Sequence, residues 1–219
     1  MKLALVTGGT RGIGKAISES LTNKYDVVTV GRSSNAVEQG DLVDSTFVDY
    51  LTNKYTPDLF INNAAMLSTD VEKSMIVNAY VPVTLMTRFY NKMNNGIIIN
   101  ISSVSAEFQS FHKETPIQTA YSLSKKIIKE ASLGLNYSKN RPVKVMCLSP
   151  AKTATDLVKG IFNYSPKEEH YTNYNWANSI CWTKPEEIAE IVNWMIDLPP
   201  WISVPEIVLD NHYSKGTVW

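Results

Sequence analysis

Short apolar segments alternate with helical patterns along the whole chain. The apolar, β-type segments are Leu3–Thr7, Asp26–Val30, Asp58–Ile61, Gly96–Ile101, Val143–Leu148 and Glu206–Leu209. Helical spacing is found between them at Gly12–Tyr25, Leu42–Tyr55, Val71–Met93, Thr119–Ser138 and Pro185–Ile196. Nearly all-apolar strands that alternate with helices predict a parallel sheet covered on both faces. The expected fold class is α/β, with one doubly wound domain over residues 1–219.

Composition narrows the possible partners. The chain has 219 residues, and its 21 basic and 21 acidic side chains give a formal net charge of zero. Nucleic-acid binders usually carry a basic excess, so no nucleic-acid partner is expected. Near-zero charge also permits self-association. Two cysteines, no long apolar run and no leader pattern favour a soluble cytoplasmic protein without a membrane partner, and no metal site is expected.

A glycine-rich loop, Thr7–Gly14, follows the first expected strand and opens the first helix. Glycines there let the backbone approach a pyrophosphate, and the helix N-terminus offers free N–H groups to it. A tight strand–helix turn without a ligand is the alternative. We expect the loop to bind a dinucleotide through Gly8, Thr10, Arg11, Gly12, Ile13 and Gly14.

The second expected strand indicates which nicotinamide cofactor is used. In NAD sites an acidic residue commonly ends this strand and pairs with the ribose hydroxyls, but here the strand runs into Gly31 and Arg32. Arg32 and Arg11 could hold a 2′-phosphate, because guanidinium groups match phosphate oxygens. The sequence therefore favours NADP(H), although Arg32 could instead be a solvated turn residue.

Tyr121 and Lys125 are four residues apart in an expected helix, so they share one face. A nearby ammonium is expected to lower the pKa of the tyrosine and so make it a proton donor or acceptor near neutral pH. Such a pair is common in helices and is weak evidence alone. Its neighbours add weight: Ser103 follows a buried-type strand, and Asn78 occupies a helix interior, which asparagine disfavours.

Taken together, these motifs resemble the short-chain dehydrogenase/reductase family over nearly the whole chain, in the same order. The matching positions are the glycine motif Thr7–Gly14, the pair Asp41–Leu42, the segment Asn62–Ala65, Asn78, Ser103, Tyr121 with Lys125, and Pro150 with Thr155. Ala65 and Ala151 stand where the family motifs have glycine. The resemblance implies a Rossmann-like fold.

The resemblance also implies a role for each matched residue. Asp41 and Leu42 would contact adenine, and Asn63 and Ala64 would line the adenosine side. Pro150, Thr153 and Thr155 would contact the cofactor, with the two threonines at the carboxamide. Lys125 would bind the nicotinamide ribose. Ser103 would orient a substrate carbonyl, Tyr121 would give it a proton, and Asn78 would hold a water that links Lys125 to solvent.

Three departures from the family pattern concern the surroundings of the site. The short segment from Arg32 to Asp41 leaves no room for the second crossover helix. The long spacing between Ser103 and Tyr121 implies an insertion over residues 104–118, and an aromatic-rich segment over residues 153–183 is expected to be a substrate lid. The last strand also lacks the usual glycine pair after it.

The expected function is that of an NADP(H)-dependent oxidoreductase that reduces a carbonyl, or oxidises the matching alcohol, of a small-molecule substrate. Alternatives are an imine or other biosynthetic-intermediate reductase on the same scaffold, a non-catalytic NADP(H)-binding regulatory protein, and a non-redox nucleotide-binding module. Retention of Asn78, Ser103, Tyr121 and Lys125 together argues against a simple binder. The family resemblance suggests a homodimer or homotetramer, and no residue identifies the substrate.

Overall fold

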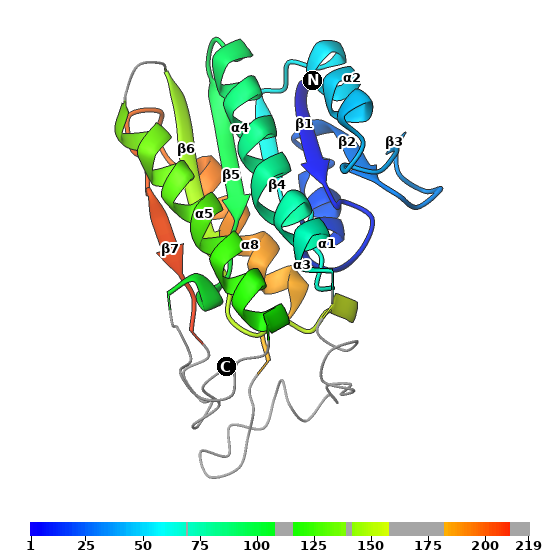
Figure 1. Ribbon diagram of the computed structural model, residues 1–219. Helices are drawn as coiled ribbons and strands as arrows, with labels where there is room; N and C mark the ends of the chain where they lie inside the picture. Colours follow the sequence, from blue (N-terminus) through cyan, green and yellow to red (C-terminus); the bar gives the residue numbers. More distant parts are fainter. Residues whose placement is uncertain (69, 108–115, 139–141, 158–181, 211–219) are drawn as a thin grey trace.

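A parallel β-sheet forms the centre of the protein (Figure 1). The computed structural model describes residues 1–68, 70–107, 116–138, 142–157 and 182–210. Within them the sheet has seven strands in the order β3-β2-β1-β4-β5-β6-β7, and every neighbouring pair is parallel. The strands are β1 (Lys2–Thr7), β2 (Tyr25–Gly31), β3 (Glu38–Gln39), β4 (Leu59–Asn62), β5 (Gly96–Ile101), β6 (Val143–Ser149) and β7 (Glu206–Val208).

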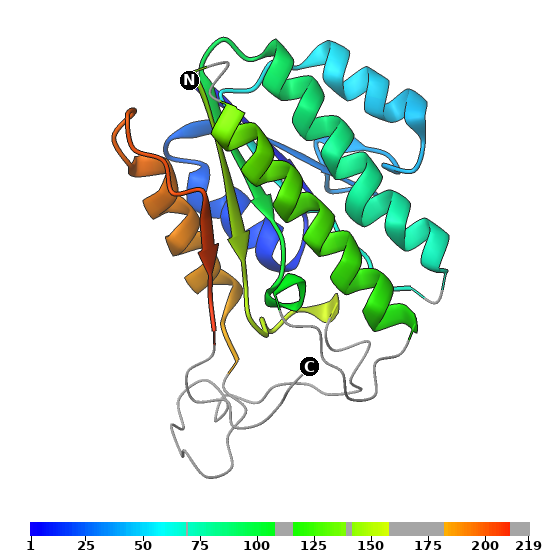
Figure 2. The ribbon, with the colours of Figure 1, turned by 60° about the vertical axis from the view of Figure 1, so that its left-hand side comes forward.

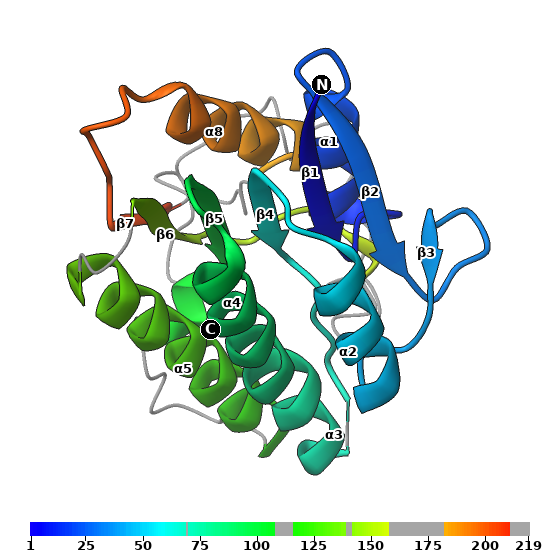
Figure 3. The same cartoon turned by 90° about the horizontal axis from the view of Figure 1, so that it is seen from above.

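Helices cover both faces of this sheet. Helices α1 (Gly12–Leu21) and α8 (Pro185–Asp197) pack together on one face, and α2 (Ser45–Lys54), α4 (Val81–Lys92) and α5 (Pro116–Ser138) cover the other (Figure 3). Helices α4 and α5 run side by side across that second face (Figure 2). The expected α/β class, with a doubly wound, Rossmann-like parallel sheet, is confirmed.

The strands divide their side chains between two cores, because successive residues of a strand point to opposite faces. Leu5 and Phe60 are fully buried against the α2, α4 and α5 side, whereas Val6 and Ile61 are fully buried against α1 and α8. Since both faces of each central strand are buried, the strands read as continuous apolar runs. Their parallel direction brings all the carboxyl ends to one edge of the sheet.

The expected helix Val71–Met93 is interrupted. It consists of α3 (Val71–Met75), a π-helical turn at Ile76–Tyr80 and then α4. Asn78 lies in the π-helical turn, where its amide pairs twice with the backbone of Met66: Oδ1 accepts from the Met66 N–H and Nδ2 donates to the Met66 carbonyl, both at 2.8 Å. The wider turn thus places a buried asparagine where it can hold the segment after β4.

The connection from β2 to α2 differs from the helical pattern expected after Leu42. Helix α2 begins at Ser45, because the Asp44 side chain accepts a hydrogen bond from the Thr46 N–H and caps the helix there. The predicted start at Leu42 was therefore wrong. The two-residue strand β3 was not predicted. Residues 32–37 form only turns, which confirms that the second crossover helix is missing.

Parts of the two irregular segments lie outside the described residues. The insertion expected over residues 104–118 begins with a 3-10 turn at Val104–Ala106 (η2), and α5 starts at Pro116; residues 108–115 are not described. Of the expected lid over residues 153–183, residues 158–181 are not described. In the described part of the chain, none of the helices combines the length and apolarity needed to traverse a bilayer.

Candidate active site

A cavity of about 620 Å³ opens at the carboxyl edge of the sheet, where the loops after β1 and β4 face each other. The strand order reverses between these two strands, and such switch points are where open α/β sheets bind ligands. Many of the residues expected to bind a cofactor line this cavity: Gly8, Thr10, Arg11, Gly12, Ile13, Arg32, Asp41, Leu42, Asn63, Ala64, Tyr121, Lys125 and Thr155.

The glycines of the first loop are required by its shape. Gly8 and Gly12 have positive φ angles of 65° and 52°, a backbone conformation that residues with a Cβ atom rarely adopt. A Cβ atom on Gly14 would lie 2.2 Å from the Gly8 carbonyl oxygen, so helix α1 can approach the loop only with a glycine there. Gly14 is buried and does not line the cavity.

Helix α1 presents its N-terminus to the cavity without a side-chain cap. Arg11 occupies the N-cap position and makes no capping hydrogen bond, and the first turn contains no acidic residue. The N–H groups of such a turn have no partner within their own helix, and the helix dipole favours an anion beside them. Gly12 and Ile13, in this first turn, line the cavity.

Hydrogen bonds of Thr7 and Asn63 connect the glycine-rich loop to the segment after β4. The buried Thr7 hydroxyl accepts hydrogen bonds from the N–H groups of Asn63 and Ala64, at 3.0 and 3.1 Å. The Asn63 amide donates to the carbonyls of Thr7 and Gly8, at 3.0 and 3.3 Å. Asn63 therefore acts on the loop through its side chain as well as lining the cavity.

The far end of the cavity carries an arginine and an acid that face each other. Arg32 Nη1 lies 4.0 Å from Asp41 Oδ2, and both side chains are well exposed. Ser33 Oγ donates to Thr10 Oγ1 at 2.8 Å on the same wall. Asp41 lies near the end of β2 because β3, which ends two residues before Asp41, pairs with β2.

Tyr121 and Ser103 meet beside the cavity. Tyr121 is half-buried in α5 and lines the cavity, and Ser103 follows β5. A hydrogen bond joins their side chains. The Ser103 hydroxyl also accepts from the Ser105 N–H and contacts the Ser105 hydroxyl, both at 3.1 Å, which fixes its position at the start of η2.

Lys125 lies under Tyr121, but its ammonium points to the backbone. Its Nζ donates to the Ile101 carbonyl at 2.8 Å and lies 5.7 Å from the centre of the Tyr121 ring. Only 3% of Lys125 is exposed, and burial lowers its pKa to about 8. Ser102 Oγ donates to the Lys125 carbonyl at 2.8 Å and so fixes α5 to the end of β5.

The expected lowering of the pKa of Tyr121 is not found. Burial raises that pKa to about 12, and the hydrogen bond with Ser103 opposes this shift only in part. The expectation was wrong because it counted the charge of Lys125 and left out the loss of solvent around the phenol. Tyr121 is consequently protonated at neutral pH, which suits a proton donor.

Other expected site residues lie near the cavity without lining it. The amide of Asn78 makes one hydrogen bond with the N–H and one with the carbonyl of Met66. The buried Thr153 hydroxyl donates to the Ala151 carbonyl at 3.0 Å, and the Pro150 carbonyl accepts from the Val104 N–H at 3.0 Å. The roles predicted for these three residues remain predictions.

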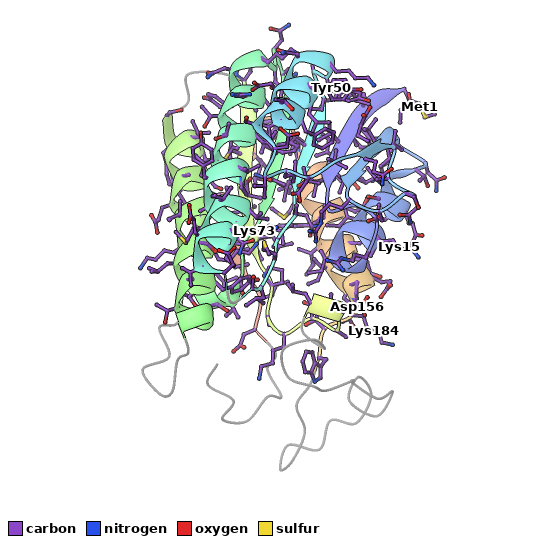
Figure 4. All side chains as sticks on the ribbon, turned by 45° about the vertical axis from the view of Figure 1, so that its right-hand side comes forward. Met1, Lys15, Tyr50, Lys73, Asp156 and Lys184 are labelled. Carbon is purple, nitrogen blue, oxygen red and sulfur yellow. The ribbon has the colours of Figure 1, made fainter. Side chains whose placement is uncertain are left out.

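The cavity also has lining residues that motif reasoning missed. Figure 4 labels two of them, Lys73 on α3 and Asp156 after β6. Met66 and Ser33 are two others, each close in sequence to an expected site residue. Proximity to the ends of β2 and β4 is a signal that could have found Ser33 and Met66. Within the described ranges, no cluster of three or more histidine, cysteine or acidic side chains could hold a metal.

Known proteins resemble this chain in sequence and in fold. A 3-oxoacyl-[acyl-carrier-protein] reductase of Chlamydia trachomatis is 27% identical, over 86% of this chain and 87% of its own. A short chain dehydrogenase of Burkholderia cenocepacia in complex with NADP has a TM-score of 0.76 at 20% identity, over 95% and 96% of the two chains. A 4-hydroxyisoleucine dehydrogenase mutant complexed with NADH and succinate also has a TM-score of 0.76, at 22% identity over 98% and 99%.

The family itself is shown by a sequence model. The short chain dehydrogenase model matches residues 41–165, which is more than half of the chain. The matched region includes Asn78, Ser103, Tyr121 and Lys125. The parallel sheet and the cavity at its carboxyl edge agree with this match. The chain therefore belongs to the short-chain dehydrogenase family of oxidoreductases.

Proposed function

We propose that this protein is an NADP(H)-dependent oxidoreductase that reduces the carbonyl group of a small molecule, with Tyr121 as the proton donor. One observation carries the proposal. A protonated, half-buried tyrosine, hydrogen-bonded to Ser103 and stacked above the buried Lys125, borders a cavity at the switch point of the sheet.

The residues around the cavity fit a dinucleotide. The positive φ angles of Gly8 and Gly12 shape the loop that borders the cavity, and the uncapped N-terminus of α1 suits a pyrophosphate. Arg11 and Arg32 supply cations for further phosphate oxygens. When bound, a nicotinamide cofactor supplies the hydride chemistry. Several structures similar to this one contain a form of NADP and another contains NADH, so the preference for NADP(H) rests on the two arginines.

The protein residues would divide the remaining work. Ser103 would hold the substrate oxygen, and Tyr121 would pass its phenolic proton to that oxygen as the alcohol forms. Lys125 would keep a positive charge beneath the phenol, held in place by the Ile101 carbonyl. Thr155, whose methyl group approaches Gly12, would contact the cofactor at the opposite wall.

The direct test is NADPH oxidation measured against a panel of aldehydes and ketones, with imines included and with Tyr121→Phe as the control. Turnover that the substitution removes would support the proposal and narrow the substrate class. NADPH binding without turnover of any carbonyl or imine would instead favour a regulatory binding protein. Equal binding of unrelated nucleotides would point to a non-redox module.

The alkaline limb of the reductive rate is expected to follow Lys125. Its pKa of about 8 lies below the usual value, so the ammonium is present below pH 8 and is lost above it. We expect kcat for reduction to be level below pH 8 and to fall by about tenfold per pH unit above it. The arginine of Lys125→Arg keeps its charge over this range, so the fall of kcat in this variant should begin only above pH 10. An unmoved limb in Lys125→Arg would rule out Lys125 as its origin.

Arg32 is expected to select for the 2′-phosphate. Because charge-assisted hydrogen bonds to phosphate are strong, Arg32→Met should weaken binding of 2′,5′-ADP about tenfold and alter binding of ADP less than twofold. Calorimetry of both nucleotides measures the ratio. Lys15→Met is the matched control, since Lys15 is an exposed cation on α1 that pairs with Glu19 and does not line the cavity. Equal losses for both nucleotides would refute a 2′-phosphate contact.

Two further expectations stay proposals. The homodimer or homotetramer rests on the family to which the chain belongs. The cytoplasmic location rests on the low cysteine content of the sequence.

A further inference from the structure

A buried ion cluster lies two helical turns beyond Tyr121. Lys129 shares the face of α5 that carries Tyr121 and Lys125, because the three residues are spaced four apart. Only 9% of Lys129 is exposed. Its Nζ donates to Glu107 Oε2 at 2.6 Å and lies 3.4 Å from Glu206 Oε1. No step of the proposed reaction uses these three groups.

The Lys129–Glu107 ion pair is largely shielded from solvent. Side-chain exposure is 11% for Lys129 and 21% for Glu107. Burial opposes the charge of Lys129, yet the hydrogen bond to Glu107 and the charges of both carboxylates raise its pKa above the ordinary value. Burial and the charge of Glu107 raise the pKa of Glu206, which makes Glu107 the firmer partner of the ammonium.

Each partner connects α5 to a different part of the fold. Glu107 follows η2, the turn that begins directly after Ser103, and it lies four residues from that serine. Glu206 opens β7, which pairs with β6 at Cys147. The Lys129–Glu107 pair therefore joins the helix of Tyr121 to the segment of Ser103, whereas the contact with Glu206 joins the same helix to the edge of the sheet.

We propose that the Lys129–Glu107 ion pair is a positioning device that sets the separation of Tyr121 from Ser103. Lys129 and Glu107 are positioning residues, because neither lines the cavity. This inference rests on the proposed function, in which both hydroxyls hold one substrate oxygen. Displacements of about 1 Å in such arrangements can lower rates about 100-fold.

Two glutamates around one lysine provide a matched test. Glu107→Gln and Glu206→Gln make the same chemical change and each removes one carboxylate from Lys129, but only Glu107 lies on the Ser103 segment. With the full chain, we expect Glu107→Gln and Lys129→Met to lower kcat by about 10- to 100-fold while the Kd for NADPH changes less than twofold. Glu206→Gln should keep kcat within about threefold of the wild type. Lys129→Arg, which keeps the positive charge, should retain most of the kcat that Lys129→Met loses.

A second readout does not need turnover. In protein labelled with ¹³Cζ-tyrosine, the Tyr121 resonance is identified by its loss in Tyr121→Phe, and its shift reports the hydrogen bond with Ser103. We expect it to move in Glu107→Gln and Lys129→Met and to stay in Glu206→Gln. Circular dichroism confirms that each variant is folded.

The outcomes separate the two ideas. Equal effects of the two glutamine variants, or an unmoved Tyr121 resonance in Glu107→Gln, would overturn the positioning role. If the wild type reduces no carbonyl, the proposed function fails, and the resonance comparison still decides whether the ion pair sets the position of Tyr121.

Discussion

Replacing Tyr121 with phenylalanine is expected to lower kcat for carbonyl reduction by about 10² to 10⁴, the usual contribution of a general acid. The substitution removes one oxygen and keeps the ring, so the packing over Lys125 is conserved. Because the pKa of Tyr121 is about 12, the phenol carries its proton throughout the neutral range. Steady-state NADPH oxidation gives kcat, and fluorescence titration gives the Kd for NADPH, which should change less than about threefold.

The matched control for this substitution lies on the same helix. Tyr137 is 65% exposed near the end of α5, so Tyr137→Phe tests the effect of losing a hydroxyl from α5 without touching the site. It should turn over at the wild-type rate. Near-normal turnover in Tyr121→Phe would remove Tyr121 from the mechanism, and another group would have to supply the proton.

Substituting Gly14 with alanine is expected to destabilise the whole fold. The added Cβ would lie 2.2 Å from the Gly8 oxygen and 2.4 Å from Asn63 Nδ2, so helix α1 must move away from the loop. Two such contacts with fixed partners place the change among the most damaging point substitutions, at about 4 kcal/mol of unfolding free energy. Because the displaced helix also carries the proposed phosphate site, NADPH binding should weaken at least tenfold. Urea unfolding and fluorescence titration measure the two effects.

Gly134 supplies the opposite case for the same substitution. It lies on the exposed side of α5, and a Cβ there would meet nothing within 4 Å. Gly134→Ala should raise the free energy of unfolding by about 0.5–1 kcal/mol, since alanine restricts the unfolded chain and favours helix. If Gly14→Ala proved as stable as Gly134→Ala, the close approach of α1 to the loop would be refuted.

The sequence was sufficient to predict six of the seven strands and many of the residues that line the cavity. Apolar runs of four to seven residues mark the central strands because both of their faces are buried, and the glycine spacing of Thr7–Gly14 can be explained by contacts that exclude a Cβ. Strand β3 escaped prediction because two residues are too short for any periodic pattern. The late start of α2 depends on the cap at Asp44, a local signal that the apolar pattern from Leu42 obscured.

Other features depend on contacts between distant parts of the chain. The raised pKa of Tyr121 results from burial by surrounding elements, and a helical spacing alone cannot show that. The pairing of Lys129 with Glu107 joins positions 22 residues apart across segments of different type. No local pattern marks such a pair, and Lys129 reads in the sequence as an ordinary surface lysine.

The π-helical turn at Ile76–Tyr80 has a consequence for how this region tolerates changes in length. Each residue of an α-helix turns the chain by about 100°, so removing one residue from the turn would restore regular α-helix and rotate α3 about its axis. Lys73 and Val77 would then leave the cavity wall, and Asn78 would no longer reach Met66. The extra residue of the π-helical turn sets the rotation of α3 relative to α4. Deleting a single residue here should therefore be tolerated less well than replacing a side chain.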